Sequence, residues 1–162
     1  MAEHIDRLAD IELAAARLLV GHAPEHVLLE TTSASVLRSA VDERRLWVAT
    51  VDDEPAGFAH VEILAADVAH LEEIDVHPRY GRHGIGTALV LEVCAWTRAA
   101  AFRLLTLTTF RAPQWNMPFY AGLGFAEVPR REWRPELERV VANETARGLD
   151  PTTRVVMAWF PG

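Results

Sequence analysis

The chain has 162 residues, a formal net charge of −7 and a hydrophobic content of 50%. Its length is enough for a hydrophobic core, and its acidic balance argues against a general nucleic-acid-binding surface, which would be basic. No apolar run approaches the ~20 residues that span a bilayer, and the N-terminus lacks the basic-then-apolar pattern of a secretory signal. Cys94 is the only cysteine, which excludes an intrachain disulfide and favours a reducing compartment. We therefore expect one cytoplasmic domain over residues 1–162, with neither membranes nor nucleic acids as partners.

The first half of the chain predicts two helices followed by three strands. Apolar residues at helical spacing indicate the helices, and short β-rich runs bounded by turn residues indicate the strands. Asp52 to Pro55 forms the expected tight turn between the first two strands. The expected helices cover residues 7–20 and 35–44, and the expected strands cover 46–51, 56–64 and 68–76.

The second half predicts a strand, a glycine turn, a helix and another strand, which is a βαβ-like unit. Such a unit places its two strands in parallel. A short helix, a strand, a helix that stops at Gly148 and a last strand follow. The expected ranges are a helix at 84–101, a strand at 103–109, a helix at 117–121, a strand at 125–133, a helix at 135–147 and a strand at 154–160.

A glycine-rich turn, Gly81 to Gly86, lies between an acidic strand and the longest predicted helix. It is not a P-loop, because no Gly-Lys-Ser/Thr follows, and its Gly-x-x-Gly-x-Gly order reverses the dinucleotide fingerprint. A helix N-terminus with glycines still offers free backbone N–H groups to a phosphate, and Arg82, His83 and Thr87 stand beside it. An ordinary strand-to-helix turn is the alternative interpretation.

A second group of residues surrounds the short helix expected from Met117. Asn116 stands at its N-cap, and Pro118 falls in the first turn, where a missing N–H costs nothing. Asn116 and Tyr120 are four residues apart and would lie on nearly the same face. The alternative is that Asn116 only caps the helix and Tyr120 only packs.

Together, these two segments resemble the GNAT superfamily of N-acetyltransferases, which use acetyl-coenzyme A. The family pattern is a strand ending in Val-x-Pro, then Arg/Gln-x-x-Gly-x-Gly/Ala at the start of a long helix. Here the strand end is Val76-His77-Pro78, and the two glycines are Gly84 and Gly86. The family's later Asn and Phe-Tyr-x-x-Leu-Gly-Phe segment is matched by Asn116 and the residues from Phe119 to Phe125.

The resemblance spans roughly Leu46 to Val128, about half of the chain. It implies an α/β fold with a mixed, mostly antiparallel sheet, a parallel pair at the coenzyme site and helices on both faces. The residues that it places at the coenzyme are Ile74, Asp75, Val76, Arg82, His83, Gly84, Ile85, Gly86, Thr87, Asn116, Phe119 and Tyr120.

Two departures from the family pattern matter. The Arg/Gln three residues before the first glycine is Gly81 here, and the arginine is displaced to Arg82. We therefore expect backbone amides to make most of the phosphate contacts, with Arg82 or His83 reaching a phosphate differently. The strand that usually precedes the first helix is missing or very short.

The implied reaction is direct transfer of acetyl from the thioester to an amine. The departing thiolate needs a proton, and a tyrosine hydroxyl can supply it because its pKa is higher than that of a thiol. Tyr120 matches the family's tyrosine and is the predicted general acid. The tetrahedral oxyanion needs N–H donors, which the strand around Val76 can offer.

The acceptor also needs a base, because an alkylamine with a pKa of ~10 is only roughly 0.1% neutral at pH 7. We predict Glu72. Period-2 alternation places Glu72 on the face that carries Ile74 and Val76, with Glu73 and Asp75 on the other face. A base that acts through water is the alternative.

The acceptor itself is left open as a small-molecule or peptide amine, and the resemblance also admits a homodimer. Trp115 and Arg111 are candidates for shaping the acceptor site. Pro24 interrupts the His22–His26 pair, so no metal is expected there. Competing interpretations are a different acyl donor, an O-linked acceptor, or a non-catalytic module that binds acyl-coenzyme A.

Overall fold

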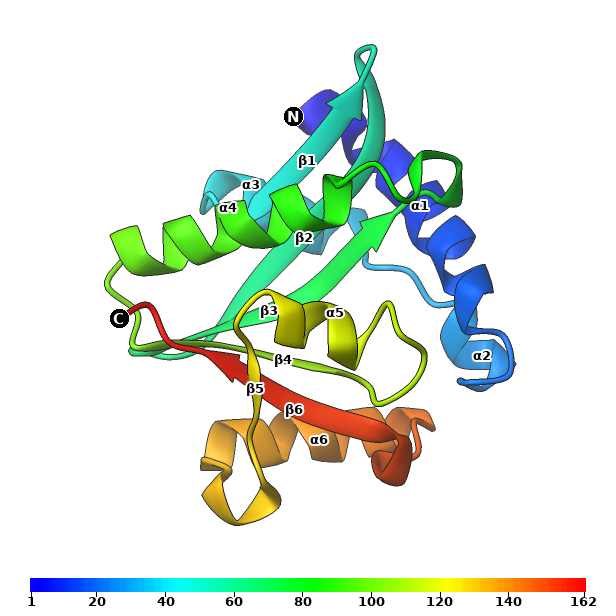
Figure 1. The fold of residues 1–162 in the computed structure, drawn as a ribbon. Coiled ribbons are helices and arrows are strands. Elements are labelled where there is room, and N and C mark those ends of the chain that lie inside the picture. The colour runs from blue at the N-terminus through cyan, green and yellow to red at the C-terminus, as the bar shows by residue number, and fades with distance from the viewer.

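A computed structural model describes residues 1–162, with Ala2 described by its backbone alone. Its centre is a six-stranded sheet in the order β1-β2-β3-β4-β6-β5 (Figure 1). Every neighbouring pair is antiparallel except β3 and β4. The strands are β1 (Leu46–Val51), β2 (Glu54–Ala65), β3 (Val68–Val76), β4 (Leu104–Phe110), β5 (Ala126–Glu127) and β6 (Arg154–Trp159). This is the mixed sheet that the sequence predicts.

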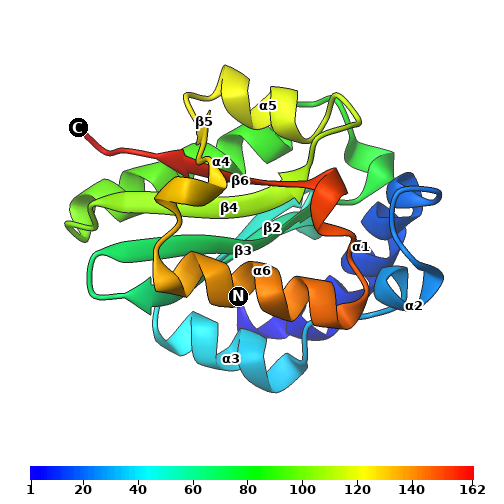
Figure 2. The ribbon, with the colours of Figure 1, turned by 90° about the horizontal axis from the view of Figure 1, so that it is seen from below.

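Helices cover both faces of the sheet (Figure 2). One face carries α4 and α5, and the opposite face carries α1, α3 and α6. The α-helices are α1 (Ile5–Ala16), α2 (Glu25–Leu28), α3 (Ala34–Asp42), α4 (Ile85–Ala99), α5 (Met117–Gly122) and α6 (Pro135–Arg147). Among the described residues, no helix has the length and apolarity that crossing a membrane requires.

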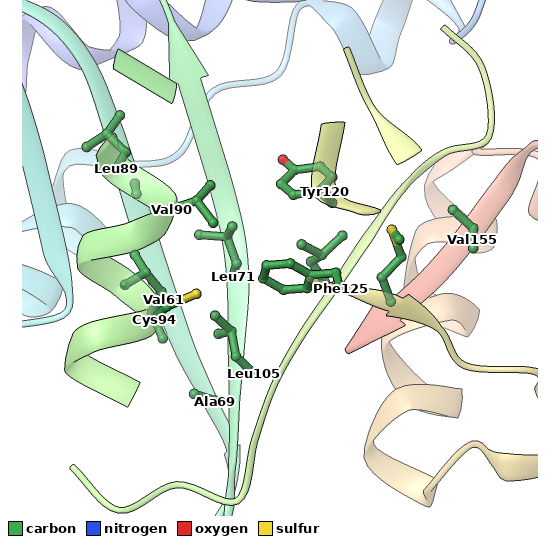
Figure 3. Packing of buried hydrophobic residues seen from close by; sticks show 14 residues of the cluster. Val61, Ala69, Leu71, Leu89, Val90, Cys94, Leu105, Tyr120, Phe125 and Val155 are labelled. Carbon is green, nitrogen blue, oxygen red and sulfur yellow. The ribbon is translucent and has the colours of Figure 1, made fainter. Parts of the chain in front are cut away.

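The larger hydrophobic core fills the space between the sheet and the α4 face. It joins Leu89, Val90 and Val93 of α4 to strand residues and to Tyr120 and Phe125 (Figure 3). A smaller cluster joins α1 and α3 to the opposite face of β1 and β2. The helical spacing in the sequence predicts these buried stripes, because each follows one face of its helix.

The parallel pair of strands is short. Paired residues run only from Val68 to His70 on β3 and from Leu104 to Thr106 on β4. Beyond these residues the two strands separate toward their C-terminal ends (Figure 1). Backbone groups on this edge of β3 are therefore left without a neighbouring strand, and the sheet is open where the predicted site lies.

A β-bulge interrupts β3 at the predicted site. Leu71 opposes Val61 and Glu73 opposes His60, so Glu72 is an extra residue between two paired positions. An extra residue shifts the alternation of the strand by one position. The residues of β3 that pack toward α4 are therefore Ala69, Leu71, Ile74 and Val76.

The predicted face of Glu72 is therefore wrong. Glu72 lies with Glu73 and Asp75 on the side of the sheet that α1 and α6 cover, and not with Ile74 and Val76. A strict period of two cannot represent a bulge, because the bulge adds a residue without adding a step of alternation.

Two other expectations differ from the structure. The strand expected at 125–133 is only Ala126–Glu127 and gives way to a 3₁₀ turn at Arg130–Glu132. The short helix α2 was not expected, because Pro24 precedes it, but a proline is compatible with the start of a helix. No strand precedes α1 among the described residues, in agreement with the expected loss of that edge.

Candidate active site

The opening between β3 and β4 is part of a cavity of about 1080 Å³. Its lining comes from both faces of the sheet, since it includes the start of α4 on one side and parts of α1 and α6 on the other. The predicted site residues that line it are Glu72, Ile74, Asp75, Val76, Arg82, Gly84, Ile85, Gly86, Thr87, Asn116, Phe119 and Tyr120. Residues predicted from two separate segments thus meet in one cavity.

At one end of this cavity, the start of α4 offers backbone donors. Gly84 has φ 78° and precedes the first helical residue, a left-handed conformation that favours glycine. The first backbone bond of the helix is from the Ala88 N–H to the Gly84 carbonyl. The three preceding N–H groups therefore have no carbonyl partner within the helix and are available to an anion.

Gly86 allows a ligand to approach the backbone closely. A Cβ atom at this position would lie 3.7 Å from the ring of Phe119 and 3.8 Å from Val76 Cγ2. It would therefore fill space between the helix start and the end of β3. The absence of a side chain leaves this space open to a ligand.

Of the two basic residues in the turn, only Arg82 lines the cavity. The ring Nδ1 of His83 lies 3.2 Å from the carbonyl oxygen of Tyr80, and the side chain is exposed outside the cavity lining. Arg82 is thus the basic side chain that this turn presents to the cavity.

Asn116 presents a hydrogen-bond donor to the same cavity. Its Oδ1 accepts a hydrogen bond of 3.1 Å from the Thr109 hydroxyl, which fixes the orientation of the amide. Its Nδ2 is buried and has no partner in the described part of the chain. Asn116 is the N-cap residue of α5, as expected, but its side chain makes no capping bond, so the alternative in which it only caps the helix is not supported, and the amide is available for a ligand carbonyl.

Tyr120 lies in α5 and lines the same cavity. Its ring packs edge-on against Phe119 and Phe125, with centroids 5.0 Å and 5.8 Å apart. The hydroxyl points away from Phe125 (Figure 3). Burial raises the pKa of Tyr120 well above its ordinary value, and the nearby charges of Asp75 and Glu73 raise it further. The hydroxyl is therefore fully protonated at neutral pH.

Glu72 lies next to His70, on the side of the sheet away from α4. Its side chain is 44% exposed, and its Oε2 lies 3.7 Å from Nε2 of His70. Burial raises the pKa of Glu72, and the charges of Glu144 and Glu62 add to this. Burial lowers the pKa of His70 to about 4. The imidazole is therefore neutral at pH 7.

Three more carboxylates gather on the same side. Oxygen atoms of Glu12, Glu73 and Asp75 all lie within 4.8 Å of one another. Burial raises the pKa of Asp75 to about 7, while the pKa of Glu73 is raised well above its ordinary value by burial and by Asp75. The pair therefore shares one proton near neutral pH.

This cluster was not predicted from the sequence. The bulge turns Glu73 and Asp75 toward α1, and Glu12 comes from a helix some 60 residues earlier, where nothing in its spacing indicates a site. The one available signal was three carboxylates, Glu72, Glu73 and Asp75, within a strand of otherwise apolar character.

Comparison with known proteins identifies the fold and the family. A family model described as Acetyltransferase (GNAT) family matches residues 6–125. An uncharacterised N-acetyltransferase from Methanocaldococcus jannaschii is 30% identical over 92 residues, which are 53% of this chain. The match spans only 41% of the length of that relative.

Solved structures show the same fold. A PaiA N-acetyltransferase from Thermoplasma acidophilum, in complex with coenzyme A, has a TM-score of 0.74 at 16% identity, covering 98% of this chain and 94% of that one. An N-acetylglutamate synthase from Neisseria gonorrhoeae, complexed with coenzyme A and N-acetyl-glutamate, has a TM-score of 0.71 at 17% identity, covering 98% of this chain and 33% of that one. The family model matches residues 6–125, which are most of the chain, so the chain belongs to the acetyltransferase (GNAT) family.

Proposed function

We propose that residues 1–162 form one catalytic domain that transfers acetyl from acetyl-coenzyme A directly to a primary amine, with both substrates bound together. The observation that carries this proposal is the single cavity through the open part of the sheet. The backbone N–H groups at the start of α4, the carboxylates of β3 and the Tyr120 side chain all line this cavity.

The coenzyme would occupy the α4 end. Arg82 and the free N–H groups at the start of α4 would hold the pyrophosphate, and Asn116 Nδ2 would donate to the pantetheine arm. The unpaired edge of β3 beyond His70 would add backbone hydrogen bonds. The Thermoplasma protein with this fold was crystallised with coenzyme A, which supports the assignment.

The amine would approach from the carboxylate end. Glu72 would take its proton directly or through a water, since the carboxylate is partly exposed in the cavity and its raised pKa makes it a better base. Backbone N–H groups of β3 around Val76 would stabilise the oxyanion, and Tyr120 would protonate the departing sulfur.

His70 would contact Glu72 through a bridging water. The Thr106 hydroxyl donates to the Ala69 carbonyl at 3.3 Å and lies 2.8 Å from Nδ1 of His70, so Nδ1 carries the proton. The Nε2 lone pair then faces Glu72 at 3.7 Å, so the ring makes no direct hydrogen bond to the carboxylate, and a water would donate to both. The same chain of contacts fixes the ring at the base of the cavity.

Release of free thiol from acetyl-coenzyme A, measured across a panel of amines, tests the proposal. We expect amine-dependent release by the wild-type protein and a loss of about 10²–10³-fold in kcat in Tyr120→Phe, a typical cost of removing a general acid. Tight coenzyme binding without thiol release for any amine would instead support a non-catalytic acyl-coenzyme A-binding module. An unchanged rate and pH profile in Tyr120→Phe would remove Tyr120 from the mechanism.

A further inference from the structure

The segment from Val20 to Thr32, which contains α2, forms one wall of the cavity and is called the α2 wall below. Its residues that line the cavity include Ala23, Val27 and Leu28. None of its residues is fully buried, and none belongs to a hydrophobic core cluster. Hydrophobic packing therefore does not fix the position of this wall, and polar contacts with other elements must do so.

His26 ties the α2 wall to the C-terminal end of α6 (Figure 2). Its Nε2 lies 2.6 Å from the carbonyl oxygen of Arg147, so Nε2 carries a hydrogen and donates it to that oxygen. Arg147 is the last residue of α6, where carbonyl groups have no partner within the helix. The ring packs closely over this helix end, because a Cβ atom at Gly148 would lie only 2.9 Å from it.

The side chain of Arg147 makes a second tie to the α2 wall. Its Nε donates to Oε2 of Glu30 at 3.0 Å, and Nη2 donates to the same oxygen. Both residues line the cavity. The guanidinium also acts on the proposed base, because burial raises the pKa of Glu72 and the charge of Arg147 opposes this rise. One residue of α6 thus holds the wall through its backbone and through its side chain.

We infer that His26 and Arg147 are positioning residues that fix the α2 wall against α6 and so set the width of the acceptor end of the cavity. This inference rests on the proposed function. The two residues act through Val27 and Leu28, which follow His26 in the chain and line the cavity. The other end of the wall is anchored separately, by hydrogen bonds of 2.6 Å and 2.7 Å from Thr32 to Glu12.

The two ties differ in strength. The side chains of Glu30 and Arg147 are 42% and 48% exposed, and an ion pair with this exposure contributes little because water screens it. The bond from His26 is short and satisfies a carbonyl at a helix end. Removal of the histidine should therefore displace the wall more than removal of the Glu30 charge.

Acceptor kinetics of His26→Ala test the inference, with the amine that gives the highest rate in the thiol-release panel as the probe. We expect the KM for this amine to rise about tenfold, while kcat and the KM for acetyl-coenzyme A change by less than about twofold. His26→Gln should restore most of the loss, because its side-chain amide can also donate to the carbonyl. A smaller fraction of folded protein would instead lower kcat and leave both KM values unchanged.

Glu30→Gln tests the weaker tie. We expect the amine KM to rise about threefold in this variant, and to stay near the wild-type value in Arg147→Lys, which keeps both the charge and the backbone carbonyl. Glu54→Gln is the matched control. It removes the carboxylate of the Arg7–Glu54 ion pair, whose side chains are 57% and 53% exposed and lie outside the cavity lining, and it should leave the amine KM unchanged.

Hydrogen exchange of the free protein gives a readout that does not depend on turnover. The N–H groups of Val27 and Leu28 donate to the Pro24 carbonyl. Their exchange should be about tenfold faster in His26→Ala than in the wild-type protein or in His26→Gln, because the wall then opens more often. Exchange within α4 should be the same in all three proteins.

Three results would overturn the inference. One is an amine KM in His26→Ala that stays within about twofold of the wild-type value, and another is an equal rise in the KM values of the amine and of acetyl-coenzyme A. The third is unchanged exchange at Val27 and Leu28 in His26→Ala. The proposed function fails separately, by the absence of thiol release with any amine. Faster exchange in His26→Ala would in that case still show that His26 holds the wall.

Discussion

The two ends of the cavity are built in different ways. The cofactor end is local: Arg82 and the helix start from Gly84 to Thr87 come from one turn, and its donors are mainly backbone groups. The acceptor end is assembled from α1, β2, β3 and α6, and its chemistry is carried by side chains. Backbone donors depend on conformation more than on residue identity. The acceptor end can therefore change its specificity by single substitutions, while the cofactor end depends on a few glycines.

The largest effect is expected for Glu72, the proposed base at the acceptor end. Glu72→Gln should lower kcat by about 10²-fold at pH 7, because the amine must then lose its proton to water. The deficit should shrink toward pH 10, where the free amine is abundant. The kcat–pH profile measures both effects.

The control for this charge removal is Glu138→Gln on the exposed surface of α6, which should leave kcat unchanged. If the deficit of Glu72→Gln were the same at all pH values, Glu72 would have a structural role and the proton would leave by another route.

At the cofactor end, the expected effect is smaller and concerns binding. Gly84→Ala places a Cβ atom at φ 78°, a conformation that costs a non-glycine residue about 1–2 kcal/mol. Relaxation of the turn would misplace the N–H donors, so we expect the affinity for coenzyme A to fall about tenfold. Isothermal titration calorimetry gives this affinity directly.

Gly122→Ala is the matched substitution outside the turn. Gly122 has no positive φ, and a Cβ atom there would meet nothing within 4 Å. Coenzyme affinity should be unchanged in this variant. Equal affinities for Gly84→Ala and the wild-type protein would show that backbone conformation at this turn does not control phosphate binding.

The smallest effect concerns stability at the acceptor end. The pKa of Asp75 is about 7 in the folded protein, against an ordinary value of 3.8. Between pH 3.8 and about pH 7 the folded protein keeps this carboxyl protonated while the unfolded chain ionises it, so the stability that the group contributes is lost as pH rises toward 7. Asp75→Asn removes the buried charge and should raise Tm by about 2–4 °C at pH 8 relative to its effect at pH 5.

Paired thermal scans at the two pH values measure this difference, with Asp53→Asn as the exposed control that shows none. A shift of the same size at both pH values would mean that Asp75 is ionised throughout this range. Glu73 and Asp75 would then not share a proton in the folded protein.

The contrast between the two ends also explains what the sequence could predict. The helix from Ile85 and the parallel pair of β3 and β4 follow from local periodicity, and the placement of Tyr120 beside them follows from the resemblance of its segment to the family motif. Signals of this kind are set by residues close together in the chain, so most residues that line the α4 end of the cavity were predicted from the sequence.

The acceptor end could not be predicted from the sequence, for physical reasons. The bulge at Glu72 puts this side chain on the same face as Glu73 and Asp75, and a strict alternation along the strand cannot predict it. Glu12 joins the site only because α1 packs across β2 and β3. His83 was expected at the phosphates, but its ring bonds to the Tyr80 carbonyl of the same turn.

A crystal structure of the protein with both coenzyme A and an amine that the thiol-release panel identifies as an acceptor tests most directly whether cofactor and acceptor meet from opposite faces of the sheet. We predict the pyrophosphate on the N–H groups at the start of α4, the sulfur beside the Tyr120 hydroxyl in the opening between β3 and β4, and the reacting nitrogen beside Glu72. An amine bound on the α4 face, or a sulfur out of reach of Tyr120, would contradict this arrangement.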